Sequence, residues 1–159
     1  MNPVPNPAFM RRAIALASEN VRHGTGGPFG AVIVKDGKIV GEAANAVTRS
    51  NDPTAHAEVE AIRAACRSLN TFNLKGAEIY ASCEPCPMCL AAIYWARIER
   101  IWFGNTSADA ARVAFDDAFL YHELTVPTRD RAVPSATLLR EEAGESFQLW
   151  RESSNKTLY

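Results

Sequence analysis

The sequence lacks any hydrophobic run long enough to cross a membrane. No stretch of its 159 residues approaches the roughly 20 consecutive apolar residues that a transmembrane helix requires. The amino-terminal segment, residues 1–7, is polar and rich in proline, which is unlike a secretory signal peptide. We therefore expect no membrane partner and a cytoplasmic location.

The sequence also lacks an excess of charge of either sign, because 17 Lys and Arg side chains face 18 Asp and Glu, for a net charge of -1. Nucleic-acid-binding domains are typically basic, so we do not expect nucleic acid as a partner. The balanced net charge does not exclude a local basic patch. Internal repeats and low-complexity tracts are absent too. With 47% hydrophobic residues, the chain is predicted to form a single domain over residues 1–159.

Cysteine is scarce, and its placement is uneven. Three of the four cysteines fall between residues 83 and 89, and Cys86 and Cys89 form a C-x-x-C pair. In a reducing cytosol such a pair indicates metal or redox chemistry rather than a structural disulfide.

Turn residues and hydrophobic periodicity predict alternating helices and strands. Asn6 and Pro7 begin a helix that ends near His23 and Gly24. Asp36-Gly37 joins strands 31–35 and 38–42 as a hairpin. The later predicted elements are a helix from Pro53 and Thr54 to Leu69, strand 77–82, helix 86–97, strand 98–103, short helices 108–113 and 116–123, strand 136–139, and a helix with a tail over 145–159. This alternation predicts an α/β sheet.

Three candidate metal ligands, His56, Cys86 and Cys89, each lie near the predicted start of a helix that follows a loop. This placement brings them toward a common edge of the sheet. Three protein ligands leave the fourth position of a tetrahedral Zn²⁺ ion open for water, which is typical of a catalytic site. Helix N-termini favour the thiolate form of the two cysteines. The sequence therefore predicts one catalytic zinc ion.

Glu58 follows His56 by two residues, where its carboxylate can approach a zinc-bound water without ligating the metal. Zinc lowers the pKa of such a water to about 7, and a carboxylate can accept its proton. His56-Ala57-Glu58 together with Pro85-Cys86-Pro87-Met88-Cys89 is the signature of zinc-dependent base deaminases. The alternatives are a redox pair, or a closed structural site with Cys83 as fourth ligand, which would leave Glu58 without a role.

Further motifs carry a resemblance to a known family. They are Gly26–Val34, Asn51–Glu58, Tyr94–Arg97, Phe115–Asp117 and the terminal Tyr159. With these motifs the chain resembles the cytidine deaminase-like superfamily and, within it, the small zinc-dependent bacterial guanine deaminases. The resemblance implies a three-layer α/β/α fold with a five-stranded mixed sheet, and hydrolysis of guanine, a purine base, to xanthine and ammonia. It also implies a homodimer that exchanges residues 140–159 between subunits.

The resemblance further assigns roles to individual residues. His56, Cys86 and Cys89 would hold zinc, and Glu58 would move protons. The substrate contacts it implies are the amide of Asn45 on the purine, Asp117 on the base edge, Phe29 and Trp95 on the ring, the backbone of Ala57 near the reacting group, and Tyr159 closing a neighbouring or shared pocket.

Each substrate contact has a structural alternative when taken alone. Asn45 could merely cap a loop, Phe29 and Trp95 could be core residues, and Asp116 could take the role of Asp117. The alternative activity is that of a tRNA adenosine deaminase or another nucleobase or nucleoside deaminase, which shares the zinc motifs. A tRNA enzyme should show a basic face, which the balanced charge does not favour.

Overall fold

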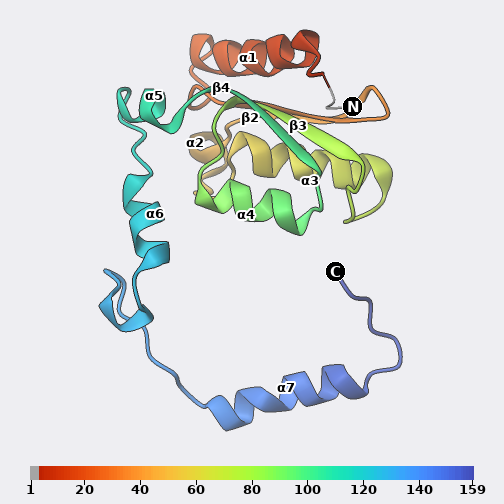
Figure 1. Cartoon of the computed structure of the whole chain (residues 1–159), viewed down its shortest axis with the longest axis vertical. Coiled ribbons are helices and arrows are strands. Elements are labelled where there is room, and N and C mark those ends of the chain that lie inside the picture. Colours follow the sequence, from red (N-terminus) through yellow and green to blue (C-terminus); the bar gives the residue numbers. More distant parts are fainter. Residues whose placement is uncertain (1–3) are drawn as a thin grey trace. The chain divides into compact units, whose positions relative to one another are not determined.

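In the computed structural model, which describes residues 4–159, the chain forms two compact units (Figure 1). The first ends at Asp117 and the second runs from Ala118 to Tyr159. The elements of the first unit are α1 (Pro7–Arg22), β1 (Gly30–Lys35), β2 (Lys38–Ala44), α2 (Val47–Ser50), α3 (Ala57–Leu69), β3 (Ala77–Cys83), α4 (Pro87–Trp95), β4 (Arg100–Asn105) and α5 (Ser107–Ala111). The second unit holds α6 (Ala118–Thr125), the 3-10 helix η1 (Thr128–Asp130) and α7 (Arg140–Glu152). The prediction of a single domain over 1–159 stays a prediction.

The described residues form one four-stranded sheet with the strand order β2-β1-β3-β4. Strand β1 is antiparallel to β2 and β3, while β3 and β4 are parallel, so the predicted mixed α/β sheet is confirmed. The expectation of five strands is wrong, because residues 136–139 form no strand. Leu139 takes a left-handed backbone with φ 49° as the N-cap of α7, which starts a helix where a strand was expected.

The predicted hairpin is confirmed at Asp36-Gly37. Both residues have positive φ, 51° and 73°, as a two-residue turn of this type requires. The turn sets the register in which Lys35 pairs with Lys38, and a shift of one residue between Ile33 and Val34 then pairs Gly30 with Ala44. This register places the amino end of β1 beside the carboxyl end of β2.

Helices cover both faces of the sheet in the first unit. On one face, Val32, Val34 and Tyr80 form a core with Ala13 of α1. The other face carries a larger core, in which α3 and α4 take part. Its members are Ala31, Ile33, Ala57, Ala61, Ala65, Leu74, Ala77, Ile79, Ile93, Ala96 and Ile98. Figure 1 shows α1 on one side of the strands, and α3 and α4 on the other.

Small residues let α3 lie directly on β2. A Cβ added at Gly41 would meet the carbonyl oxygen of Ala61 and the amide nitrogen of Ala65, both at 2.5 Å. The strand therefore has no room for a side chain at this position. The close approach fixes α3, and with it His56 at its N-terminus, relative to the sheet.

Several element boundaries differ from the prediction. The short helix α2 was not predicted, and α7 begins at Arg140 rather than Glu145. Helix α3 begins at Ala57, because Asp52 Oδ1 accepts hydrogen bonds from the backbone N–H and the hydroxyl of Thr54 and so holds residues 52–54 in a turn. Within residues 4–159, no helix is long and apolar enough to span a membrane.

Candidate active site

The sheet directs the candidate site residues to one of its edges. The pairs Gly30–Ala44 and Cys83–Asn105 show that β1 begins where β2, β3 and β4 end. Phe29 and Asn45 flank the first pair, and the loop to Cys86 follows Cys83. Ligands of open α/β sheets bind outside the carboxyl ends of the strands, which is this edge.

The three candidate ligands meet at the N-termini of two helices. His56 is the N-cap of α3, Cys86 is the N-cap of α4, and Cys89 lies in the first turn of α4. His56 Nδ1 lies 3.6 Å from Cys86 Sγ and 3.4 Å from Cys89 Sγ. All three donor atoms lie within 4.8 Å of one another.

These distances fit a tetrahedral zinc ion. Zinc–sulfur bonds of about 2.3 Å and zinc–nitrogen bonds of about 2.0 Å place a nitrogen and a sulfur ligand roughly 3.5 Å apart at the tetrahedral angle. The measured separations of 3.6 and 3.4 Å bracket that value. One imidazole and two thiols also form a donor set that zinc prefers.

The surroundings favour the thiolate form of Cys86. Its pKa is lowered to about 4, chiefly by a hydrogen bond from Cys89 and also by His56. The same hydrogen bond, together with burial, raises the pKa of Cys89. The hydrogen bond with Cys86 raises the pKa of His56. The first thiolate of the cluster therefore forms on Cys86, at the positive end of α4.

Glu58 is buried beside this cluster, with 6% of its surface exposed. Burial raises the pKa of its carboxyl group, and the charge on Cys86 raises it further. An acidic side chain is rarely this deeply buried without a partner or a function. The structure therefore brings a proton-accepting group to the three candidate ligands.

Cys83 stands apart from the three ligands. It is buried at the end of β3, and its thiol donates to the carbonyl oxygen of Thr106 over 3.6 Å. Burial raises its pKa to about 11, which disfavours the thiolate that a metal needs. The group of donor atoms within 4.8 Å does not include it, so the geometry does not support a closed four-ligand site.

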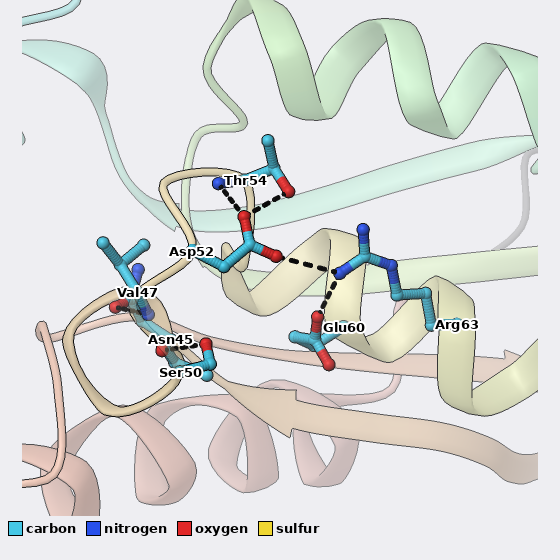
Figure 2. Close-up of polar contacts among 8 residues, drawn as sticks. Asn45, Val47, Ser50, Asp52, Thr54, Glu60 and Arg63 are labelled. Carbon is cyan, nitrogen blue, oxygen red and sulfur yellow. Dashed lines mark hydrogen bonds and ion pairs between the residues drawn. The ribbon is translucent and has the colours of Figure 1, made fainter.

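Hydrogen bonds fix the start of the loop between β2 and α3, and an ion pair lies near its end (Figure 2). At its start, Asn45 Oδ1 accepts from the backbone N–H of Gly27 at 3.4 Å and of Val47 at 3.3 Å. Near its end, Asp52 lies 3.8 Å from Arg63, a residue of α3. With Oδ1 occupied, Nδ2 is the part of the Asn45 amide that could donate to a ligand.

Two more residues that were predicted to contact the substrate, Phe29 and Asp117, lie at this edge of the sheet. The rings of Phe29 and Phe115 meet edge to face, with centroids 4.9 Å apart. Burial raises the pKa of Asp117, and the charges of Cys86 and Glu84 raise it further, which puts this carboxylate within electrostatic range of the cluster. The sequence motif that contains Phe115 does not predict this contact with Phe29, because the two residues are far apart in the chain.

Trp95 is not brought to the cluster, and the contact assigned to Tyr159 stays a prediction. Trp95 ends α4, nine residues from Cys86 along the helix, which corresponds to about 13 Å along the helix axis. Tyr159 belongs to the second unit. Ala57, in contrast, is fully buried as the first residue of α3, directly after His56.

Comparison with known proteins supports the assignment of this chain to the deaminases. Residues 5–105 match the family described as the cytidine and deoxycytidylate deaminase zinc-binding region. The guanine deaminase of Bacillus subtilis is 52% identical over 151 residues, which are 95% of this chain and 97% of that protein. The tRNA-specific adenosine deaminase of Aquifex aeolicus is 42% identical over 118 residues, 74% of this chain and 76% of that protein.

Comparison with solved structures supports the same assignment. The X-ray structure of guanine deaminase from Bacillus subtilis has a TM-score of 0.94 at 50% identity and covers 98% of this chain and 99% of its own. A structure of guanine deaminase from Nitrosomonas europaea has a TM-score of 0.68 at 27% identity, with 73% and 67% covered. With its zinc-binding motifs on the matched fold, this chain belongs to the cytidine and deoxycytidylate deaminase zinc-binding family.

Proposed function

We propose that this protein is a zinc-dependent guanine deaminase, which hydrolyses guanine to xanthine and ammonia. The observation that carries the proposal is the 52% identity to a guanine deaminase over 95% of the chain. That match includes most of residues 118–159, whereas the tRNA-specific adenosine deaminase matches 74% of the chain. Purine salvage or catabolism is the corresponding process.

In this proposal, His56 Nδ1 and the sulfur atoms of Cys86 and Cys89 hold one zinc ion. Their separations of 3.4 to 3.6 Å support this assignment. Zinc in a three-ligand site supplies activation of a water molecule for attack on an electrophilic carbon. The electrophile here is C2 of guanine, which bears the amine that leaves.

Glu58 moves the protons of the reaction. Its buried carboxylate accepts a proton from the attacking water and delivers it to ring N3. It then accepts the second proton from the hydroxyl group added at C2 and delivers it to the exocyclic amine, which leaves as ammonia while C2 becomes a carbonyl. The support for this role is its position two residues from His56 and its burial beside the candidate ligands.

The purine is bound by groups at the same sheet edge. Asn45 offers its Nδ2 donors to acceptors of the purine, and Asp117 accepts hydrogen bonds from adjacent N–H groups of the guanine edge. Adenine presents a different pattern there, so Asp117 would favour guanine. Phe29 packs on the ring, and the backbone of Ala57 faces the reacting group.

The remaining assignments rest on the resemblance. They are a homodimer that exchanges residues 140–159, a substrate contact for Trp95, and closure of a neighbouring or shared pocket by Tyr159. The three-layer description of the fold belongs with them, supported by cores on both faces of the sheet. A cytoplasmic location stays a prediction.

Ammonia release from the zinc-loaded protein tests the proposal. The substrates are guanine, adenine, cytosine, cytidine and a tRNA anticodon stem–loop, offered separately, with product identified by chromatography. We expect turnover of guanine with xanthine as product. Turnover of the stem–loop alone would overturn the proposal in favour of tRNA editing, and release of no ammonia from any substrate would overturn an enzymatic role for these bases.

A further inference from the structure

The buried face of α1 carries an asparagine among small apolar residues. Asn20 shares this face with Ala13 and Ala17, and only 4% of its surface is exposed. A buried amide is destabilising unless its polar atoms form hydrogen bonds. The partners of Asn20 therefore show what this residue is used for.

Among residues 4–159, the side-chain hydrogen bonds of Asn20 go to the two loops at the candidate site. Its Nδ2 donates to the carbonyl oxygen of Gly27 at 2.9 Å and to that of Asn45 at 2.8 Å. Its Oδ1 accepts from the hydroxyl of Thr25 at 2.6 Å. The two carbonyl groups can only accept, so they set the Nδ2 end of the amide toward them, and the Thr25 hydroxyl satisfies the Oδ1 end.

The same loops carry Asn45 and Phe29. Asn45 donates its backbone N–H to the carbonyl oxygen of Phe29 at 2.9 Å, and Phe29 donates its own to that of Gly27 at 2.9 Å. Gly27 in turn donates to Asn45 Oδ1. Asn20 thus joins a closed set of hydrogen bonds that fixes both the backbone and the side-chain amide of Asn45.

The loop that contains Gly26 packs tightly against Asn20 and Asn45. A Cβ added at Gly26 would lie 2.4 Å from the carbonyl oxygen of Asn45 and 2.6 Å from Asn20 Nδ2. The backbone of this loop is therefore in close contact with the Asn20 amide. Movement of that amide would shift Asn45 directly.

We infer that Asn20 is a positioning residue for substrate binding, which acts through Asn45 and Phe29 and whose Oδ1 is held by the Thr25 hydroxyl. This inference rests on the proposed function. Asn20 contacts neither the candidate metal ligands nor Glu58 in the hydrogen bonds of the described chain. Its effect should therefore fall on substrate affinity rather than on zinc binding.

Two near-isosteric variants test the inference. Asn20→Asp replaces the donating nitrogen by an oxygen that faces two carbonyl oxygens, and Thr25→Val removes the hydroxyl that donates to Oδ1. We expect KM for guanine to rise by about 10- to 100-fold in Asn20→Asp, since small misplacement of a binding group has effects of this size. Thr25→Val should show a smaller rise, with kcat less affected and zinc content unchanged in both. Thr25→Ser keeps the hydroxyl and should restore KM.

Tyr80→Phe is the matched control, because it removes a buried hydrogen-bonding hydroxyl elsewhere on α1's side of the sheet. Tyr80 accepts from the backbone N–H of Asn6 at 3.1 Å and belongs to the core that contains Ala13. This variant should lower the melting temperature without raising KM. A loss of affinity in the Asn20 variant then cannot be ascribed to general destabilisation.

A double-mutant cycle with Asn45→Ala identifies the route. If Asn20 acts through Asn45, Asn20→Asp should raise KM much less in the Asn45→Ala background than in the wild type. Independent effects of the two substitutions, or unchanged KM in both Asn20→Asp and Thr25→Val, would overturn the inference while the wild type still turns over guanine. A wild type that does not turn over guanine would instead overturn the proposed function, and the inference with it.

Discussion

Replacement of Glu58 by Gln separates proton transfer from zinc binding. Glu58 is 6% exposed and lies at the second position of α3, two residues after His56. The amide has nearly the same size, so the packing around it and the three candidate ligands stays intact. What the variant loses is a group that can accept and deliver a proton.

The expected loss follows from the usual contribution of a positioned acid or base. Such groups contribute about 10²- to 10⁴-fold in rate, or roughly 3 to 5 kcal/mol of transition-state stabilisation. We therefore expect kcat for guanine to fall by about 10²- to 10⁴-fold, with one zinc ion per chain retained. The assay is ammonia release from guanine together with metal analysis of the same sample.

Glu60→Gln is the matched control on the same helix. Glu60 pairs with Arg63 at 2.5 Å and is 27% exposed, so its replacement should cost about 0.5 kcal/mol of stability or less and leave turnover unchanged. Activity of Glu58→Gln within threefold of wild type would refute the assigned proton transfer. Loss of zinc from Glu58→Gln would show instead that Glu58 supports the metal site.

Three further predictions concern specificity and stability. Asp117→Ala should reduce the preference for guanine over its analogues while zinc content is retained; unchanged relative rates would contradict the role of Asp117. The Arg12 guanidinium holds the pKa of the Glu42 carboxyl below its usual range. The ion pair therefore stabilises the fold fully above the unfolded-state pKa of about 4.3, and this stabilisation is lost as the pH falls through the lower pKa of the folded state. Since the two side chains are 39% and 33% exposed, Arg12→Met should lower the free energy of unfolding in urea at pH 7 by about 1 kcal/mol or less, and this loss should shrink as the pH falls through the folded-state pKa of Glu42; a loss of equal size throughout the acid range would contradict this. Gly41→Ala should destabilise by about 1 to 3 kcal/mol, because its Cβ would meet the backbone of α3, whereas Gly144→Ala, with nothing within 4 Å of the added atom, should not lower the melting temperature.

Local patterns predicted most elements of the first unit. The N-cap Asn6 with Pro7 begins α1 as expected, and Asp36-Gly37 closes the hairpin, because these residues act on their immediate backbone. The start of α3 was predicted too early because the turn formed by Asp52 and Thr54 competes with the helix. The apolar pattern at residues 136–139 did not suffice to predict a strand, since a strand also needs a neighbouring strand with which to pair.

The candidate site was predicted where the signal is a spacing along the chain. His56-Ala57-Glu58 and Cys86-x-x-Cys89 each place their side chains within one helical turn, so the type of chemistry follows from sequence alone. Asn20 could have been found, because a polar residue at the buried position after Ala13 and Ala17 is a visible break in the pattern of α1. Its partners could not, because they lie on loops that approach only in the folded chain.

The sequence by itself therefore determined the candidate donor set, the candidate carboxylate for proton transfer and the alternation of helices and strands, all of which depend on residues near one another in the chain. Only the tertiary structure decided that two helix N-termini bring His56 within 3.6 Å of both cysteines, and that Cys83 stays outside the cluster. It also decided that Asn20 supports Asn45 across 25 residues of chain. The physical reason is that strand pairing and the close packing of helices on the sheet set these long-range distances, and neither can be calculated from local preferences.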